Sequence, residues 1–254
     1  MVNAAPRGVV LVTGGAKRIG KTLCLAVARI GFDVAVHHRG SGPEAKSLID
    51  EIGALGRKAE AFQADLSLET DIQALVPAVA ERMGPITLLI NNASLFHDDR
   101  VGSLSRASWD AHMQTNLRAP LVLAEALAAQ LPPGQDGQII NLLDQRVLKP
   151  NPQFFTYSLT KAALWHATKT LAQALAPHIR VNGVGPGPTL ASIHQDDETF
   201  AAEAANTLLQ TPADPQQIAA AVLYLIDAAS VTGQMIAVDG GQHLAWRTAD
   251  IIGD

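Results

Sequence analysis

Short runs of apolar, often β-branched residues alternate along this chain with longer segments rich in Ala and Leu. The apolar runs predict strands at 9–12, 32–36, 57–62, 86–90, 138–143, 179–182 and 235–238. Apolar positions three and four residues apart predict helices at about 19–30, 45–55, 71–83, 119–130, 155–176, 198–209 and 215–225. The fourth of these helices has a second candidate start near residue 108. Strands that alternate with helices predict an α/β fold with a parallel sheet covered on both faces.

The chain shows no internal repeat and no linker-like break, so we predict a single domain over residues 1–254. Its strongest irregularity is Pro186-Gly187-Pro188, which is followed by a polar, uneven segment. We expect a substrate lid at about 188–212, with an ordinary surface loop as the alternative.

Composition narrows the class of protein. The 254 residues include 19 basic and 24 acidic side chains, for a formal charge of −5, and 48% are apolar. Such a chain is able to form a large core, and its acidic balance argues against a nucleic-acid or membrane partner. The lone Cys24 cannot form an internal disulfide and is expected to be a buried thiol. No apolar run approaches the ~18 residues of a membrane span, and residues 1–8 lack the order of a secretory signal, so we expect a cytoplasmic protein.

A glycine-rich segment, Thr13 to Gly20, lies between the first strand and the first helix. A tight turn requires Gly14, and close packing of helix on sheet favours Gly20. The following helix N-terminus directs free N–H groups at a phosphate, which predicts a dinucleotide site. The alternative is a tight turn without a ligand.

The end of the second strand indicates which nicotinamide cofactor binds. An acid there accepts hydrogen bonds from the ribose 2′-OH, but this chain reads His37-His38-Arg39, with no acid before Glu44. Arg39 is able to grip a 2′-phosphate, and Lys17 adds a second cation. We therefore predict NADP(H) rather than NAD(H); the alternative is that Arg39 is a solvated surface charge.

Tyr157 and Lys161 stand four positions apart in a predicted helix, so their side chains share one face. Hydride transfer to a carbonyl or imine requires a proton donor beside it. A free phenol has a pKa of about 10, and a nearby ammonium favours the phenolate and lowers that pKa. The pair is therefore a candidate acid–base group.

Together these features resemble the short-chain dehydrogenase/reductase family from Val9 to about Gly241. The matching motifs are Thr13-Gly14 with Gly20, Asp65, Asn91-Asn92-Ala93, Asn116, Tyr157 with Lys161, and Pro186-Gly187. The resemblance implies a Rossmann-type doubly wound sheet. It implies a cofactor site made of Gly14, Lys17, Arg18, Ile19, Gly20, His38, Arg39, Asp65, Leu66, Asn92, Ala93, Tyr157, Lys161, Pro186 and Gly187.

Several roles follow only from this resemblance. Asp65 and Leu66 are expected to border the adenine, and Asn92 is expected to lie along the cofactor. Lys161 is expected to hold the nicotinamide ribose. Asn116 is expected to support a water-linked proton relay, with a helix-capping or kinking role as the alternative.

Three positions depart from the usual family pattern and are typical of its pteridine reductase branch. Arg18 replaces the middle glycine of the turn, Ser94 replaces a glycine after Asn91-Asn92-Ala93, and Asp144 replaces the Ser thirteen positions before Tyr157. A carboxylate there repels an oxyanion but suits a nitrogen heterocycle, and burial raises its pKa toward acid catalysis.

The branch resemblance implies a substrate site made of Arg18, Ser94, Phe96, Asp144 and Tyr157. The ring of a pterin would stack between the nicotinamide and Phe96. Arg18 would reach both the cofactor phosphates and the pterin, and Ser94 would hydrogen-bond the pterin. The alternatives are a structural cap for Asp144, core packing for Phe96 and a phosphate-only or surface role for Arg18.

We therefore expect an NADPH-dependent reductase of a pterin, dihydropterin or dihydrofolate-like ring. Two alternatives remain: a reductase of a 3-oxoacyl or sugar carbonyl, and a catalytically idle NADP(H)-binding regulator. The resemblance also implies a homotetramer or dimer. No metal is expected, since His97-Asp98-Asp99 is typical of a polar loop.

Overall fold

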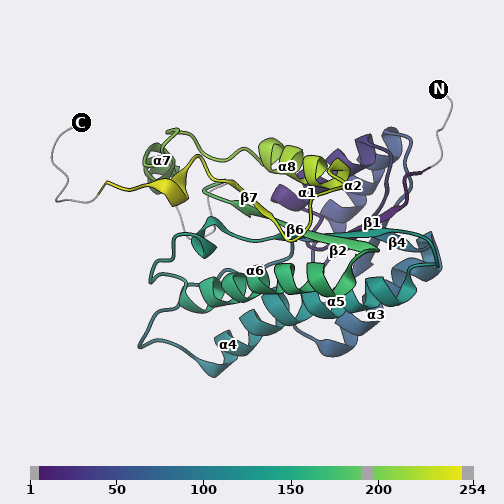
Figure 1. Cartoon of the computed structure of the whole chain (residues 1–254), viewed down its shortest axis with the longest axis horizontal. Helices are drawn as coiled ribbons and strands as arrows, with labels where there is room; N and C mark the ends of the chain where they lie inside the picture. Colours follow the sequence, from purple (N-terminus) through teal and green to yellow (C-terminus); the bar gives the residue numbers. More distant parts are fainter. Residues whose placement is uncertain (1–5, 190–196, 248–254) are drawn as a thin grey trace.

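The computed structural model describes residues 6–189 and 197–247. Within these residues, seven strands form one parallel sheet in the order β3-β2-β1-β4-β5-β6-β7 (Figure 1). The strands are β1 (Val9–Val12), β2 (Asp33–His38), β3 (Ala59–Gln63), β4 (Ile86–Asn91), β5 (Gly137–Leu142), β6 (Ile179–Pro186) and β7 (Met235–Val238). The chain winds outward from β1 in one direction and from β4 in the other. This is the predicted Rossmann-type, doubly wound fold.

Helices cover both faces of the sheet. They are α1 (Arg18–Arg29), α2 (Gly42–Ala54), α3 (Glu69–Met83), α4 (Arg106–Met113), α5 (Ala119–Gln130), α6 (Phe155–Leu175), α7 (Asp197–Ala205) and α8 (Pro215–Asp227). A π-helical turn, η1 (Gln114–Arg118), joins α4 to α5, and short 3₁₀ turns follow β5, as η2 (Gln145–Val147), and β7, as η3 (Gln242–Leu244). Helices α1, α2 and α8 pack on one face, and α3, α5 and α6 on the other (Figure 1).

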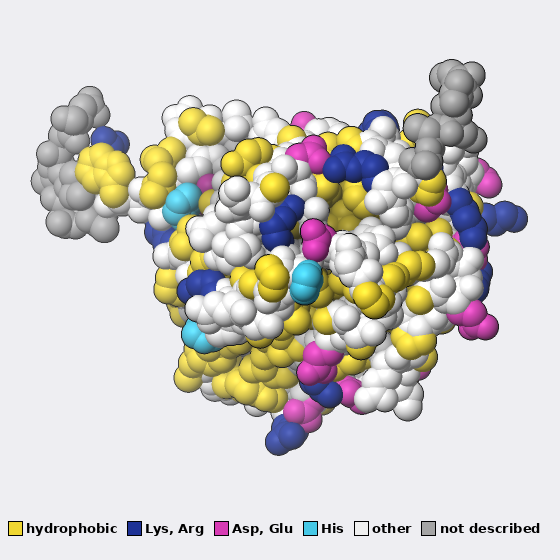
Figure 2. Space-filling view, turned by 45° about the vertical axis from the view of Figure 1, so that its right-hand side comes forward, with side chains coloured by type: hydrophobic (Ala, Val, Ile, Leu, Met, Phe, Trp, Pro, Cys, Tyr) yellow, Lys and Arg dark blue, Asp and Glu magenta, His cyan; other side chains and the backbone are white. Residues whose placement is uncertain are grey.

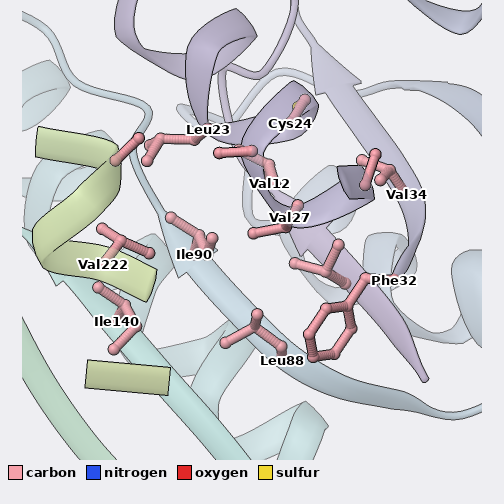
Figure 3. Packing of buried hydrophobic residues seen from close by; sticks show 14 of the residues in the cluster. Val12, Leu23, Cys24, Val27, Phe32, Val34, Leu88, Ile90, Ile140 and Val222 are labelled. Atoms are coloured by element: carbon pink, nitrogen blue, oxygen red, sulfur yellow. The ribbon is translucent and has the colours of Figure 1, made fainter. Parts of the chain in front are cut away.

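The first of these layers shows why the strand sequences are so apolar. Leu23 and Val27 of α1 and Val222 of α8 are fully buried against the sheet, where they meet Val12 and Ile90 (Figure 3). Because the opposite face of the sheet carries a second buried cluster, the side chains on both faces of each central strand are shielded from solvent. Continuous apolar runs are the sequence signature of that arrangement.

The single thiol lies in the same layer. Cys24 is completely buried, as predicted, and burial raises its pKa well above the usual value.

Two helix boundaries differ from the sequence expectation. The helix expected at 119–130 is preceded by α4 and η1, so the helical path begins at Arg106, near the second candidate start. The helix expected at 198–209 ends at Ala205. There the Thr207 hydroxyl donates to the Ala204 carbonyl, while the Leu209 N–H donates to Gly240, so the backbone turns toward the end of β7. The middle of the predicted lid, 190–196, lies outside the described residues.

The surface is mixed in charge. On the face in Figure 2, Lys and Arg side chains are interspersed with Asp and Glu. Among the described residues, none of the helices combines the length and the apolar character that crossing a bilayer requires.

Candidate active site

A hollow of about 390 Å³ opens at the carboxyl ends of the strands, where the winding direction of the sheet reverses. Open α/β sheets bind ligands at this position. The residues that line it are Gly14, Lys17, Arg18, Ile19, Gly20, His37, Arg39, Asp65, Leu66, Asn92, Ala93, Ser94, Leu95 and Thr115. Most of the predicted cofactor residues therefore share one cavity.

The glycine-rich turn connects β1 to α1 and forms one wall of this hollow. Gly14 has a φ of +60°, which an L side chain rarely adopts. A Cβ on Gly20 would overlap the Gly14 carbonyl oxygen and lie 2.8 Å from Nδ2 of Asn92. The turn therefore favours glycine at position 14 for its backbone conformation and requires it at position 20 for close packing. Arg18, at the position of the usual middle glycine, also takes a positive φ of 53°.

Asn92 joins the end of β4 to this turn. Its side-chain Nδ2 donates to the carbonyls of Thr13 and Gly14 at 2.9 and 3.0 Å. The Thr13 hydroxyl in turn accepts the backbone N–H groups of Asn92 and Ala93. The Asn92 side chain thus holds the turn against β4.

His37, which sequence analysis did not select, braces the turn from the other side. The Gly14 N–H donates to His37 Nδ1 at 3.0 Å, and His37 Nε2 lies 3.1 Å from the Ala64 carbonyl oxygen. This pattern requires the neutral imidazole with its proton on Nε2. Burial lowers the pKa of His37 to about 4, so the imidazole stays neutral near pH 7. The sequence does contain a signal for this role, since a histidine within an apolar strand requires a hydrogen-bond partner when it is buried.

The two cations predicted to recognise a 2′-phosphate both line the hollow. Arg39 follows β2, and Lys17 precedes α1, where its Nζ lies 2.6 Å from Oε1 of Glu44. His38, predicted beside them, is buried outside the lining, and its Nδ1 has no hydrogen-bond partner in the described structure.

Asp65 and Leu66 lie after β3 on the far wall of the hollow. The Asp65 Oδ1 accepts from the Ser67 N–H and hydroxyl at 2.9 and 2.7 Å. These two hydrogen bonds lower the pKa of Asp65, so it presents a carboxylate. The position suits the predicted border of a nucleotide base.

The predicted acid–base group assembles beyond the hollow. Asp144 follows β5, and Tyr157 and Lys161 occupy one face of α6. The Tyr157 hydroxyl donates to Oδ2 of Asp144 at 2.7 Å, and Lys161 Nζ donates to the Leu142 carbonyl at 2.7 Å. Tyr157 and Lys161 are 6% and 3% exposed.

Burial controls ionisation in this group. It raises the pKa of Asp144, as predicted, and lowers the pKa of Lys161 to about 8. The pKa of Tyr157 is raised well above its usual value, by burial and by the adjacent Asp144 carboxylate. The expectation that Lys161 lowers it is wrong, because burial and the direct contact with Asp144 both act in the opposite direction. Lys161 Nζ instead lies 5.6 Å from the centre of the Tyr157 ring.

Asn116 lies in the π-helical turn η1 and is 1% exposed. Its Oδ1 accepts from the Leu95 N–H at 2.7 Å, and its Nδ2 donates to the Leu95 carbonyl and to the Thr160 hydroxyl. The side chain therefore connects the loop after β4 to α6. These contacts are not those of a helix cap, so the relay role and its capping or kinking alternative both stay predictions.

Phe96 lies in that loop and contacts two further aromatic rings. It stacks on Phe154 with a centroid distance of 4.0 Å and an interplanar angle of 9°, and it meets the Tyr157 ring edge-on at 4.6 Å. The Arg146 guanidinium carbon lies 5.5 Å from the Phe96 centroid and 5.0 Å from that of Phe154. Sequence analysis missed Phe154 and Arg146, because nothing in their spacing indicates that they meet Phe96.

The remaining predicted residues lie at the edges of the site. Ser94 lines the hollow, and its hydroxyl lies within 3.3 Å of the Leu95 carbonyl. Pro186 ends β6, and the Gly187 N–H donates to the Val238 carbonyl. A Cβ on Gly187 would lie 2.7 Å from Asp239, so this approach of two chain segments requires glycine. Pro186 and Gly187 are outside the lining of the 390 Å³ hollow.

Two further observations concern the surroundings. Over residues 6–189 and 197–247, no group of three or more His, Cys, Asp or Glu side chains is placed to hold a metal ion. A second hollow, of about 540 Å³, runs along α4, η1 and α5 and contains none of the predicted site residues.

The geometry agrees with comparisons to known proteins. A family model described as short chain dehydrogenase matches residues 8–201. The 3-oxoacyl-[acyl-carrier-protein] reductase FabG of Staphylococcus epidermidis is 30% identical over 239 residues, which cover 92% of this chain and 98% of that protein.

Two solved structures are more similar. FolM alternative dihydrofolate reductase 1 from Brucella canis, complexed with NADP, is 48% identical, with a TM-score of 0.94 and coverage of 99% of this chain and 100% of that one. Its counterpart from Brucella suis, in complex with NADP, is 50% identical, with a TM-score of 0.93 and the same coverage. The chain belongs to the short-chain dehydrogenase family, and the predicted class of oxidoreductase is confirmed.

Proposed function

We propose that this protein is an NADPH-dependent reductase of a pterin, dihydropterin or dihydrofolate-like ring. The observation that carries the proposal is the hydrogen bond between Tyr157 and Asp144. A carboxyl group held against the reactive phenol suits protonation of a ring nitrogen and disfavours an oxyanion from a ketone. The FolM structures support the same substrate class.

The residues of the hollow fit NADP(H). The close approach of Gly20 to Gly14 leaves a cradle beside the N-terminus of α1, where free N–H groups favour a phosphate. Arg39 and Lys17 supply positive charge for the 2′-phosphate. We propose that Asp65 and Leu66 border the adenine and that Lys161 holds the nicotinamide ribose. Relatives solved with NADP bear out the choice of cofactor.

When bound, the reduced cofactor supplies a hydride to a carbon of the substrate ring. Asp144 and Tyr157 then supply one proton to the adjacent ring nitrogen. Burial raises the pKa of Asp144, which favours a protonated carboxyl beside the neutral phenol as the proposed donor state of the pair. After transfer, the pair holds a carboxylate that accepts the Tyr157 hydroxyl hydrogen, and the 2.7 Å between the two oxygens supports this step. Hydride and proton together saturate one C=N bond.

Phe96, Arg18 and Ser94 are proposed to position the substrate. One face of Phe96 is covered by Phe154, and we propose that a flat substrate ring stacks on the opposite face, near Tyr157. Arg18 and Ser94 line the adjoining hollow, where they connect the substrate end to the cofactor end. Asn116 is proposed to act in proton supply.

Reduction of a 3-oxoacyl or sugar carbonyl is the second candidate, favoured by 30% identity to FabG. The position occupied by Ser in ordinary family members is Asp144 here, which argues against it. An idle regulator is disfavoured, because binding a nucleotide does not require a buried Tyr157–Lys161 pair.

A panel assay tests the proposal. NADPH oxidation is measured with 7,8-dihydrobiopterin, 7,8-dihydrofolate, an acetoacetyl thioester and a ketose. We expect turnover with the first two and a large loss of that turnover in Asp144→Ser. Turnover with the thioester or the sugar alone contradicts the proposal, and tight NADPH binding without any turnover favours the regulator.

Three further predictions remain to be tested. These are the single domain with a lid at about 188–212, the homotetrameric or dimeric state, and the cytoplasmic location. Limited proteolysis with and without ligand, light scattering and cell fractionation respectively address them.

A further inference from the structure

Arg146, which none of the roles above uses, lies next to both the catalytic pair and the aromatic rings. It belongs to η2, directly after β5, and its backbone N–H donates to Oδ1 of Asp144 at 2.8 Å. Its guanidinium contacts Phe96 and Phe154 together, and it lies nearer to Phe154. Phe96 is the ring that also touches Tyr157. The guanidinium therefore lies close to Phe96, the ring proposed to stack with the substrate, and slightly closer to Phe154.

One nitrogen of this half-buried guanidinium lacks the acceptor that burial normally demands. Arg146 Nη1 is shielded from solvent and has no hydrogen-bond partner within the described part of the chain. A buried charged donor without an acceptor carries a desolvation cost that a bound acceptor would remove. An orphan donor of this kind requires an explanation, and an acceptor that binds after a small turn of the side chain supplies one.

The adjacent Asp144 carboxylate makes no hydrogen bond to Arg146 Nη1 in the described structure. Asp144 accepts from the Arg146 backbone and from the Tyr157 hydroxyl, so both of its oxygens are engaged. The guanidinium carbon lies 5.5 and 5.0 Å from the centres of the two stacked Phe rings, so these rings restrict how the side chain turns. A pre-oriented guanidinium recognises a carboxylate or carbonyl oxygen much better than a hydroxyl group.

We propose that Arg146 is a specificity-determining residue that binds an acidic or acyl oxygen on the substituent of the substrate ring. It thereby favours pterins conjugated to an aminobenzoyl-amino-acid side chain, as in dihydrofolate, over unconjugated pterins with a short hydroxylated chain. The inference rests on the proposed function and extends it. In this arrangement Phe96 supports the ring that is reduced, while Phe154 and Arg146 meet the substituent.

The test compares KM for 7,8-dihydrofolate with KM for 7,8-dihydrobiopterin, with NADPH saturating. Asp144 and Tyr157 serve both substrates, so any change in their ionisation cancels in the ratio of the two KM values. A charge-assisted hydrogen bond corresponds to a factor of about 10 to 100 in affinity. In Arg146→Met we expect the ratio, dihydrofolate over dihydrobiopterin, to rise by that factor.

A conservative variant and a control variant accompany this measurement. Arg146→Lys keeps the charge but loses the planar fork, so a rise of roughly threefold to tenfold is expected. Arg29→Met changes an exposed arginine of α1 and should leave the ratio unchanged. An unchanged ratio in both Arg146 variants overturns the inference, and Arg146→Lys alone decides the matter if Arg146→Met fails to fold.

A binding measurement separates this inference from the proposed function. Folic acid and biopterin are titrated calorimetrically into the NADP⁺-loaded wild type and Arg146→Met. If the wild type reduces neither 7,8-dihydrofolate nor 7,8-dihydrobiopterin, the proposed function fails. A selective loss of folic acid binding in Arg146→Met supports the role of Arg146 even in that case. Equal affinities of wild type and variant for folic acid overturn that role.

Discussion

The cofactor end and the catalytic end of the site are built in different ways. At the cofactor end, Gly14 and Gly20 pack closely, and the turn is held by hydrogen bonds from Asn92 and the neutral His37. At the catalytic end, ionisable side chains from separate segments meet in a buried cluster. Steric fit therefore determines cofactor binding at the first end, and the protonation of side chains determines catalysis at the second. Substitutions should reveal this difference, as steric effects on binding in one region and as effects on turnover and pH in the other.

The largest effect is expected at the catalytic end. Tyr157→Phe removes the proposed proton donor, so kcat should fall by about 10²–10⁴-fold, the usual contribution of general acid–base catalysis. NADPH affinity, measured by fluorescence titration, should change little. Tyr224→Phe, on the exposed face of α8, is the matched control. Unchanged turnover in Tyr157→Phe would show that Tyr157 is not the proton donor.

A steric change at the cofactor end is expected to act through binding. In Gly20→Ala the new Cβ meets the Gly14 carbonyl, and backbone does not move cheaply. NADPH affinity should fall by about 10–100-fold and the free energy of unfolding by about 1–3 kcal/mol, as for other overpacked sites.

Gly53→Ala is the control for this change. Gly53 lies inside α2 with nothing within 4 Å of its added Cβ. The free energy of unfolding should rise there by about 0.5–1 kcal/mol, because alanine is the better helix former. Equal losses of NADPH affinity in both variants would contradict the steric account.

A smaller effect is expected for cofactor choice. Arg39→Gln removes one of the two cations proposed to bind the 2′-phosphate, so the preference for NADPH over NADH should fall by about tenfold. Lys17→Gln should have a weaker effect, because its ammonium is already paired with Glu44. Tighter binding of NADH than of NADPH by the wild type would contradict the proposal that Arg39 binds the 2′-phosphate.

The smallest effect is a pH dependence of stability. Lys161 has a folded pKa of about 8, below its ordinary value of 10.5, so between these values the unfolded chain binds more protons. The free energy of unfolding should therefore gain up to roughly 1 kcal/mol per pH unit from Lys161 in this window.

Chemical denaturation of the wild type and Lys161→Met, at pH 7 to 9.5, isolates this contribution. Cys24 and Tyr157 also titrate differently on unfolding, but their contributions cancel in the difference between the two proteins. A difference that does not vary with pH would show that Lys161 is not desolvated.

The order of strands and helices was predictable because burial on both faces of a parallel sheet leaves continuous apolar runs. Family membership was predictable for a related reason: Gly14, Gly20, Tyr157 and Lys161 serve functions that depend on short spacings within one turn or one helix. The end of α7 was less predictable, because a contact with Gly240 directs the chain after it.

The local sequence determined the glycine turn, the four-residue spacing of Tyr157 and Lys161, and the charge at the end of β2. Only the tertiary structure decided that His37 braces Gly14 and that Arg146 contacts Phe96 and Phe154. It also decided that burial, together with the contact to Asp144, raises the pKa of Tyr157. The physical reason is that short-range spacing is written into helix and strand geometry. Burial and the meeting of distant side chains arise only when the whole sheet is assembled.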